Sequence, residues 1–124
     1  FSHAGILQCE GQLMTIIPGR TACYRCIFPG PPPGNTVAPC GQAGVLGVLP
    51  GVIGSLQATE AIKYLLGMGA LLTDALLTYD ALAMSFRKVP AGRRNDCPLC
   101  SANPTLTTLV DEGKVSCNRK GCKC

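Results

Sequence analysis

Two pairs of cysteines carry the strongest chemical signal in the sequence. Cys23 and Cys26 form one Cys-x-x-Cys motif, and Cys97 and Cys100 form a second one. Zinc prefers tetrahedral thiolate coordination in structural sites, and two intervening residues let one turn present both sulfurs to the same ion. Four thiolates leave no coordination position open for a substrate. The spacing predicts a structural zinc that clips distant parts of the chain together.

Two other interpretations of these pairs stay open at this point. Either pair alone could be a thioredoxin-like redox motif, although neither stands at the strand-to-helix turn that such a motif requires. The four thiols could also be unrelated to one another. A disulfide framework is disfavoured, because the nine cysteines are odd in number and no signal peptide opens the chain. The sequence therefore predicts a reducing, cytoplasmic environment.

Cys40 is a candidate nucleophile. It stands between a proline-rich stretch and the start of a predicted helix, where the positive end of the helix dipole lowers a thiol pKa. A thiolate formed there would be an effective nucleophile, whereas the competing interpretation is a small buried apolar side chain. Cys9 is predicted to lie in the core of a strand, and His3, the only histidine, is given no catalytic role.

Several elements must position these cysteines. A β-like stretch at residues 12–17 ends at Pro18 and Gly19, a turn dipeptide, and Gly11 before it is predicted to mark a bend or bulge. The other expected elements are a proline-rich mobile loop at 28–39, a strand hairpin formed by 75–79 and 85–89, and a short helix at 105–110.

A long helix is predicted over residues 43–67, kinked or divided at Pro50 and ended by Gly67. Its expected apolar face consists of Leu56, Ile62, Leu65 and Leu66, and its expected polar face of Gln57, Glu60 and Lys63. Small residues recur at spacings of three or four and predict tight packing against a sheet: Gly47, Gly51, Ser55 and Ala58.

The length, composition and net charge of the chain restrict the classes of protein to consider. A chain of 124 residues with 47% hydrophobic and 15% charged residues is one small folded domain. The net charge of +4 lacks the dense basic stripe with interleaved aromatic residues that nucleic-acid binding requires. The most apolar run, residues 43–56, is shorter than the roughly 18–20 residues that span a bilayer. We therefore expect neither a nucleic-acid partner nor a membrane partner.

The motifs together resemble the ThiF/MoeB/HesA superfamily, whose members include relatives of the ubiquitin-activating enzymes. The similarity runs in order from about residue 4 to 110 and is carried by EGQ at 10–12, CYRC at 23–26, Cys40, GVLG at 44–47, PGVIGSLQA at 50–58, EAIK at 60–63, YDA at 79–81 and CPLC at 97–100.

The resemblance implies an activity and a site. Members of this superfamily use ATP and magnesium to adenylate the C-terminal glycine of a ubiquitin-like sulfur-carrier protein, in thiamine, molybdopterin or tRNA-thiolation pathways. It implies that the four paired cysteines hold structural zinc, that Cys40 handles sulfur or the acyl group, and that the full enzyme is a homodimer.

One departure from the superfamily pattern limits what this chain can do. The glycine-rich phosphate loop and the residues that engage ATP and magnesium belong to an N-terminal half that this sequence does not contain, so the chain alone is not expected to be active.

The expected fold is therefore α/β: the C-terminal half of a Rossmann-like ubiquitin-activating-type domain, with antiparallel strands, one long packed helix and a zinc clip. Residues 1–110 form this half, and residues 111–124 form a tail rich in cysteine and lysine, with Cys117, Cys122 and Cys124 unassigned. The alternative function is a non-catalytic, zinc-stabilised module that binds a ubiquitin-like partner.

Overall fold

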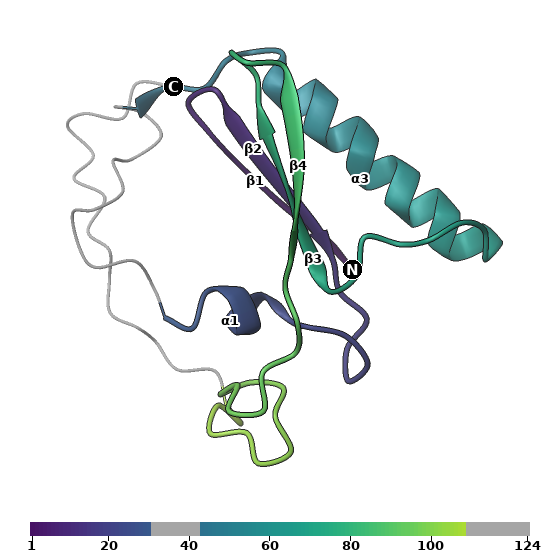
Figure 1. Ribbon diagram of the computed structural model, residues 1–124, viewed down its shortest axis with the longest axis vertical. Coiled ribbons are helices and arrows are strands. Elements are labelled where there is room, and N and C mark those ends of the chain that lie inside the picture. The colour runs from purple at the N-terminus through teal and green to yellow at the C-terminus, as the bar shows by residue number, and fades with distance from the viewer. Residues whose placement is uncertain (31–42, 109–124) are drawn as a thin grey trace.

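The computed structural model describes residues 1–30 and 43–108, which form an antiparallel sheet flanked by one long helix (Figure 1). Two hairpins make up the sheet. The first consists of β1 (Ser2–Leu7) and β2 (Glu10–Thr15), and the second of β3 (Ala75–Asp80) and β4 (Ser85–Pro90). The four strands follow the order β1-β2-β3-β4, and every neighbouring pair is antiparallel. This confirms the α/β class, the antiparallel strands and the hairpin of the second half.

The first hairpin differs from the prediction, which had a single β-like stretch there. The chain reverses at Gln8 and Cys9, and Gln8 adopts the left-handed conformation at φ 52°. Cys9 therefore lies in a half-exposed turn and not in the core of a strand, and its carbonyl accepts a hydrogen bond from Ala81 at 2.9 Å. No bulge forms at Gly11, because β2 keeps a continuous register with both neighbours.

The long helix, α3 (Leu49–Leu66), begins later than predicted and ends where predicted. Residues 44–46 run beside the first hairpin instead, where Gln8 exchanges hydrogen bonds with Gly44 and Leu46. Pro50 lies in the first helical turn, where its missing N–H costs nothing, and therefore starts the helix where a kink was predicted. Gly67 closes the helix in the left-handed conformation at φ 62°.

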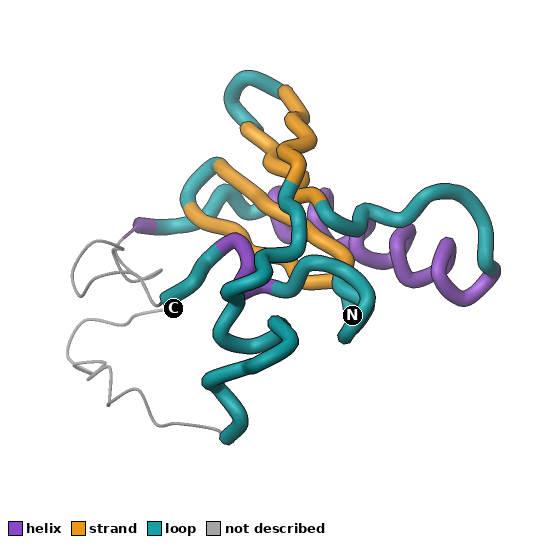
Figure 2. Tube along the Cα trace, turned by 60° about the horizontal axis from the view of Figure 1, so that its bottom comes forward, coloured by secondary structure: helices purple, strands orange, loops and turns teal. Residues whose placement is uncertain are grey.

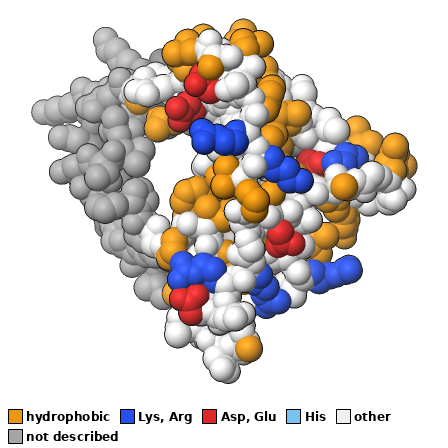
Figure 3. Space-filling view, in the orientation of Figure 1, with side chains coloured by type: hydrophobic (Ala, Val, Ile, Leu, Met, Phe, Trp, Pro, Cys, Tyr) orange, Lys and Arg blue, Asp and Glu red, His pale blue; other side chains and the backbone are white. Residues whose placement is uncertain are grey.

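The predicted faces of α3 are wrong at most positions. Leu49 and Ile53 are buried against β1 and β2, and Leu56 packs beside them, as its assignment to the apolar face predicted. The other three residues assigned to that face are exposed: Ile62 (55%), Leu65 (80%) and Leu66 (68%). Hydrophobic side chains therefore reach the surface over α3, and others do so at the tip of the β3–β4 hairpin (Figure 3).

Glu60, assigned to the polar face, is buried because its carboxylate has a complete set of partners. It accepts hydrogen bonds from the Thr15 hydroxyl at 2.7 Å and the Leu72 N–H at 2.6 Å, and it pairs with Lys63. Burial by itself raises the pKa of Glu60, but the hydrogen bonds from Lys63, Leu72 and Thr15 outweigh it, and the net shift is downward. A buried carboxylate thus pins α3 to β2 and to the loop before β3.

Gly11 allows the sheet to approach α3 closely. A Cβ atom at this position would lie 2.5 Å from Cδ1 of Ile53, closer than real side chains ever pack. The small residues that were predicted to serve this purpose do not: Gly51, Ser55 and Ala58 are exposed, and nothing lies within 4 Å of a Cβ built on Gly51. The close approach is therefore provided by the strand and not by the helix.

Gly11→Ala is expected to destabilise the chain by about 1–3 kcal/mol, the usual cost of overpacking a well-packed core. The matched control is Gly54→Ala in α3, where an added Cβ meets no atom within 4 Å and alanine favours the helix by up to about 1 kcal/mol. Chemical denaturation of both variants with zinc present measures the difference. A Gly11→Ala protein as stable as wild type would show that the strand and helix are not in close contact.

The opposite face of the sheet carries the cysteine-bearing segments at one end. Because side chains alternate along a strand, Met14 points away from α3, towards a second core that also contains Ile16 and Ala22. The short helix α1 (Tyr24–Ile27) and the segment that follows β4 lie together on this side (Figure 2). No helix forms over residues 105–108, and the remainder of the helix predicted at 105–110 lies outside the described residues.

Some predictions fall on parts of the chain that the structure does not describe. These are most of the loop at 28–39, Cys40, and the tail with Cys117, Cys122 and Cys124. Among the described residues, no helix combines the length and the apolar character needed to cross a membrane.

Candidate metal centre

The first cysteine pair is positioned by a tight turn after β2. The N–H groups of Arg20 and Thr21 both donate to the carbonyl of Ile17, and the Thr21 hydroxyl accepts from the Ile17 N–H at 2.9 Å. The chain then enters α1 with Cys23 as its N-cap and Cys26 inside the helix. One helical turn therefore presents both sulfurs on the same side, as the two-residue spacing predicts.

The second pair is positioned by the segment that follows β4. Cys97 and Ser101 close a turn through an N–H to carbonyl bond of 3.2 Å. Arg93 connects this turn to the first one: its guanidinium donates to the carbonyl of Gly19 at 3.0 Å and to that of Cys100 at 3.2 Å. The two motifs, distant in sequence, are therefore held side by side.

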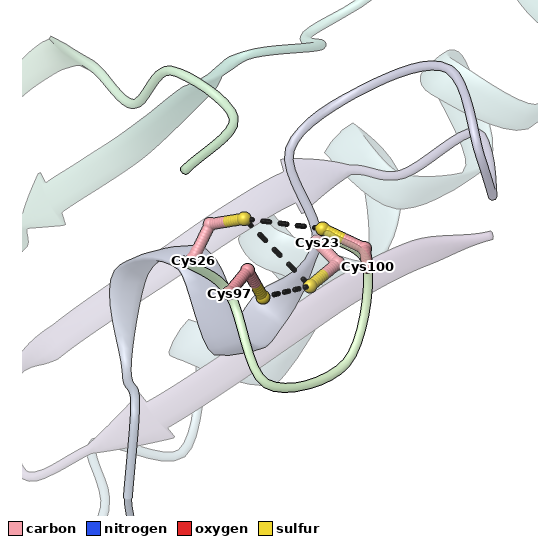
Figure 4. A group of neighbouring side chains, drawn as sticks. All are labelled: Cys23, Cys26, Cys97 and Cys100. Carbon is pink, nitrogen blue, oxygen red and sulfur yellow. Dashed lines mark hydrogen bonds between the residues drawn. The ribbon is translucent and has the colours of Figure 1, made fainter. Parts of the chain in front are cut away.

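The four sulfurs face one another in a single cluster (Figure 4). The Sγ atoms of Cys23 and Cys26 are 3.8 Å apart, those of Cys23 and Cys97 are 3.6 Å apart, and those of Cys26 and Cys100 are 3.4 Å apart. All four ligand atoms lie within 4.8 Å of one another. Cys97 is completely buried, and Cys23 and Cys26 are nearly so.

This arrangement can hold one metal ion. Tetrahedral zinc with Zn–S bonds of about 2.3 Å places its sulfurs about 3.8 Å apart, which is close to the separations found here. The four-sulfur cluster also argues against a redox motif made of one pair, since each thiol has neighbours from both motifs. Among the described residues, this is the group of side chains that could hold a metal.

The cysteines differ in how easily they lose a proton. Burial is the main reason that the pKa of Cys23 is raised to about 12. Burial also acts to raise the pKa of Cys97, but hydrogen bonds from the backbone N–H groups of Cys100 and Leu99 lower it to about 6. The backbone N–H groups around Cys97 therefore favour its thiolate form, and a metal would displace protons from the cluster as it binds.

A further hollow of about 440 Å³, which no sequence motif predicted, lies on the sheet face that α3 leaves uncovered. Its lining combines Gln12, Thr78 and Arg87, which are neighbours across β2, β3 and β4, with Glu10 and Asp80 at the hairpin ends. Alternation of polar with apolar residues along β2 and β3 could have indicated this polar face.

A comparison with protein-family models matches residues 1–100 to the ThiF family. The chain belongs to the ThiF family. This confirms the family resemblance that the motifs indicated, and the matched region contains both cysteine pairs.

Curated relatives agree with this family. The ThiF-family chain is 56% identical, over 86% of its length and 41% of the relative's, to a sulfur carrier protein adenylyltransferase of Thermus thermophilus. It is 50% identical to the adenylyltransferase and sulfurtransferase MOCS3 of Culex quinquefasciatus, over 85% of this chain and 24% of that one. The chain thus spans a quarter to two fifths of the length of these relatives.

Solved structures support the fold. The crystal structure of MccB from Escherichia coli superimposes with a TM-score of 0.66 over 83% of this ThiF-family chain and 32% of MccB. Sequence identity in that alignment is 16%, so the similarity establishes the shared fold alone.

Proposed function

We propose that this chain is part of an enzyme that adenylates the C-terminal glycine of a ubiquitin-like sulfur-carrier protein. The observation that carries the proposal is the 56% identity to a sulfur carrier protein adenylyltransferase. In this reaction a carboxylate oxygen of the glycine attacks the α-phosphate of ATP, an acyl–phosphate bond forms, and pyrophosphate leaves. ATP and magnesium are assigned to the N-terminal part of the enzyme, because this sequence contains no glycine-rich phosphate loop.

The metal in this proposal is zinc, held by Cys23, Cys26, Cys97 and Cys100. When bound, it supplies a structural cross-link and no reactive position, because four thiolates fill its coordination sphere. The protein's own contribution is to bring the end of the first hairpin and the segment after β4 to one point. Thiolates are maintained in a reducing compartment, which supports placing the enzyme in the cytoplasm.

A homodimer of the full enzyme is part of the proposal. Its support here is the exposed apolar surface of α3, with Leu65 at 80% and Leu66 at 68% exposure. Large exposed apolar patches on protein surfaces commonly mark sites of contact with another protein.

The competing proposal is a non-catalytic, zinc-stabilised module that binds a ubiquitin-like partner. The DNA upstream of the codon for Phe1 distinguishes the two. We expect about 150 codons in frame, the size of a domain, that encode a strand, a glycine-rich loop and a helix. A start codon directly before Phe1 would favour the module and contradict the enzyme.

Cys40 is proposed to be the reactive thiol of the enzyme, and we expect it to alkylate faster than free cysteine at neutral pH. Zinc would shield the four clustered thiols, while Cys9 in its half-exposed turn provides an internal comparison. Brief iodoacetamide treatment followed by peptide mapping gives the order of labelling. If Cys40 stays unlabelled while Cys9 and the tail cysteines react, it is a packed thiol and not a nucleophile.

A further inference from the structure

Asp74 lies between the two cysteine-bearing segments without belonging to either. It immediately precedes β3, the strand that separates β2 from β4 in the sheet. The first cysteine motif follows β2 and the second follows β4. A residue at this end of β3 is therefore next to both chain segments as they leave the sheet.

Two hydrogen bonds connect Asp74 to those segments. Its carboxylate Oδ1 accepts the N–H of Ala22 at 2.6 Å, and Ala22 is the fully buried residue directly before Cys23. Its main-chain carbonyl accepts the N–H of Ala91 at 2.9 Å, on the segment that leads from β4 to Cys97. Asp74 thus contacts both arms of the cluster, one through its side chain and one through its backbone.

The backbone of Asp74 is adapted to this double contact. It adopts the left-handed conformation at φ 51°, which few residues besides glycine tolerate, aspartate and asparagine being the usual exceptions. A hydrogen bond to a charged acceptor is also roughly twice as strong as one between neutral groups. The bond to Ala22 is partly buried, whereas the bonds that Arg93 makes between the two arms are exposed to solvent.

We infer that Asp74 is a positioning residue for the metal centre: its carboxylate and carbonyl hold Ala22 and Ala91 so that both cysteine pairs reach one point. The inference rests on the proposed role of the four cysteines as a metal site. Residues that orient metal ligands commonly change metal affinity by 10- to 100-fold when they are replaced.

Three substitutions in the 124-residue chain test this role. Asp74→Gly keeps the left-handed backbone but removes the acceptor, and Asp74→Asn keeps a neutral acceptor oxygen. The matched control is Asp80→Gly at the other end of β3, where the carboxylate accepts the local N–H groups of Leu82 and Ala83. Each zinc-loaded protein is mixed with an excess of a chromogenic chelator, and the rate of zinc transfer is recorded.

We expect Asp74→Gly to release zinc about tenfold faster than wild type, the lower end of the usual range. Asp74→Asn is expected to release it about threefold faster, because a neutral acceptor forms the weaker bond. Asp80→Gly is expected to match wild type, even if it loses some stability. Equal release rates for Asp74→Gly and Asp80→Gly would overturn the inference, as would an unchanged rate in Asp74→Asn if the glycine variant does not fold.

A cobalt-substituted form separates positioning from general destabilisation. Cobalt–thiolate charge-transfer bands report the ligand geometry directly, and we expect them to shift in Asp74→Gly but not in Asp80→Gly. If Cys97→Ser still binds one zinc per chain, the proposed metal site itself has failed. If Cys97→Ser loses zinc while the Asp74 variants behave like wild type, only the positioning role has failed.

Discussion

Cys97→Ser is expected to lose the bound zinc and most of the stability of the fold. Cys97 is completely buried in the four-sulfur cluster, and hydrogen bonds from the backbone N–H groups of Cys100 and Leu99 lower the pKa of its thiol. A serine hydroxyl has nearly the same size but stays protonated, so the packing is retained while the ligand is lost. Structural zinc in small domains binds with apparent free energies of about 10–16 kcal/mol, and binding energy is folding energy in such sites.

Losing this binding free energy would unfold the domain, since the total free energy of unfolding of a typical domain is about 5–15 kcal/mol. Metal analysis should therefore give one zinc per chain for wild type and none for Cys97→Ser, which should unfold at room temperature. The matched control is Cys9→Ser, which alters a half-exposed thiol outside the cluster and should retain the metal. A wild-type chain without zinc, or with a disulfide between Cys23 and Cys26, would contradict the metal centre.

The cysteine pairs could be predicted from the sequence because their chemistry requires a fixed local spacing. Each Cys-x-x-Cys motif presents two sulfurs from one turn whatever the rest of the fold does. The hairpin predicted at 75–79 and 85–89 could also be recognised, since its two strands are close in the sequence and a short connection after Asp80 joins them. In both cases the decisive interactions are local in sequence.

The helix shows where sequence reasoning fails. Of the four residues assigned to its apolar face, only Leu56 packs beside the residues that contact the sheet, Leu49 and Ile53. The other three are exposed: Ile62, Leu65 and Leu66. Glu60 was assigned to solvent and is buried, because partners from β2 and from the loop after α3 satisfy its carboxylate. Partners that are distant in the sequence do not affect the local pattern of polar and apolar residues. The contacts of Asp74 with Ala22 and Ala91 could not be predicted for the same reason.

Under the proposed function, removing the last glycine of the carrier protein is expected to abolish the reaction of the longer enzyme proposed to contain this chain. In the proposed reaction the terminal carboxylate attacks ATP, so a carrier shortened by one residue presents the nucleophile in the wrong place. Proximity and orientation account for a large part of enzymatic rate enhancement, about 7–11 kcal/mol in well-oriented systems. A small displacement of the carboxylate should therefore bring the rate down to background.

The most direct measurement is the exchange of labelled pyrophosphate into ATP by the longer enzyme in the presence of its sulfur-carrier protein. Adenylation is reversible before the acyl group moves on, so exchange reports formation of the acyl-adenylate itself. We predict exchange that requires magnesium and the intact carrier, that falls to background with the shortened carrier, and that is absent when the 124-residue chain is used alone. Exchange by this chain alone, or none by the longer protein with its intact carrier, would contradict the account.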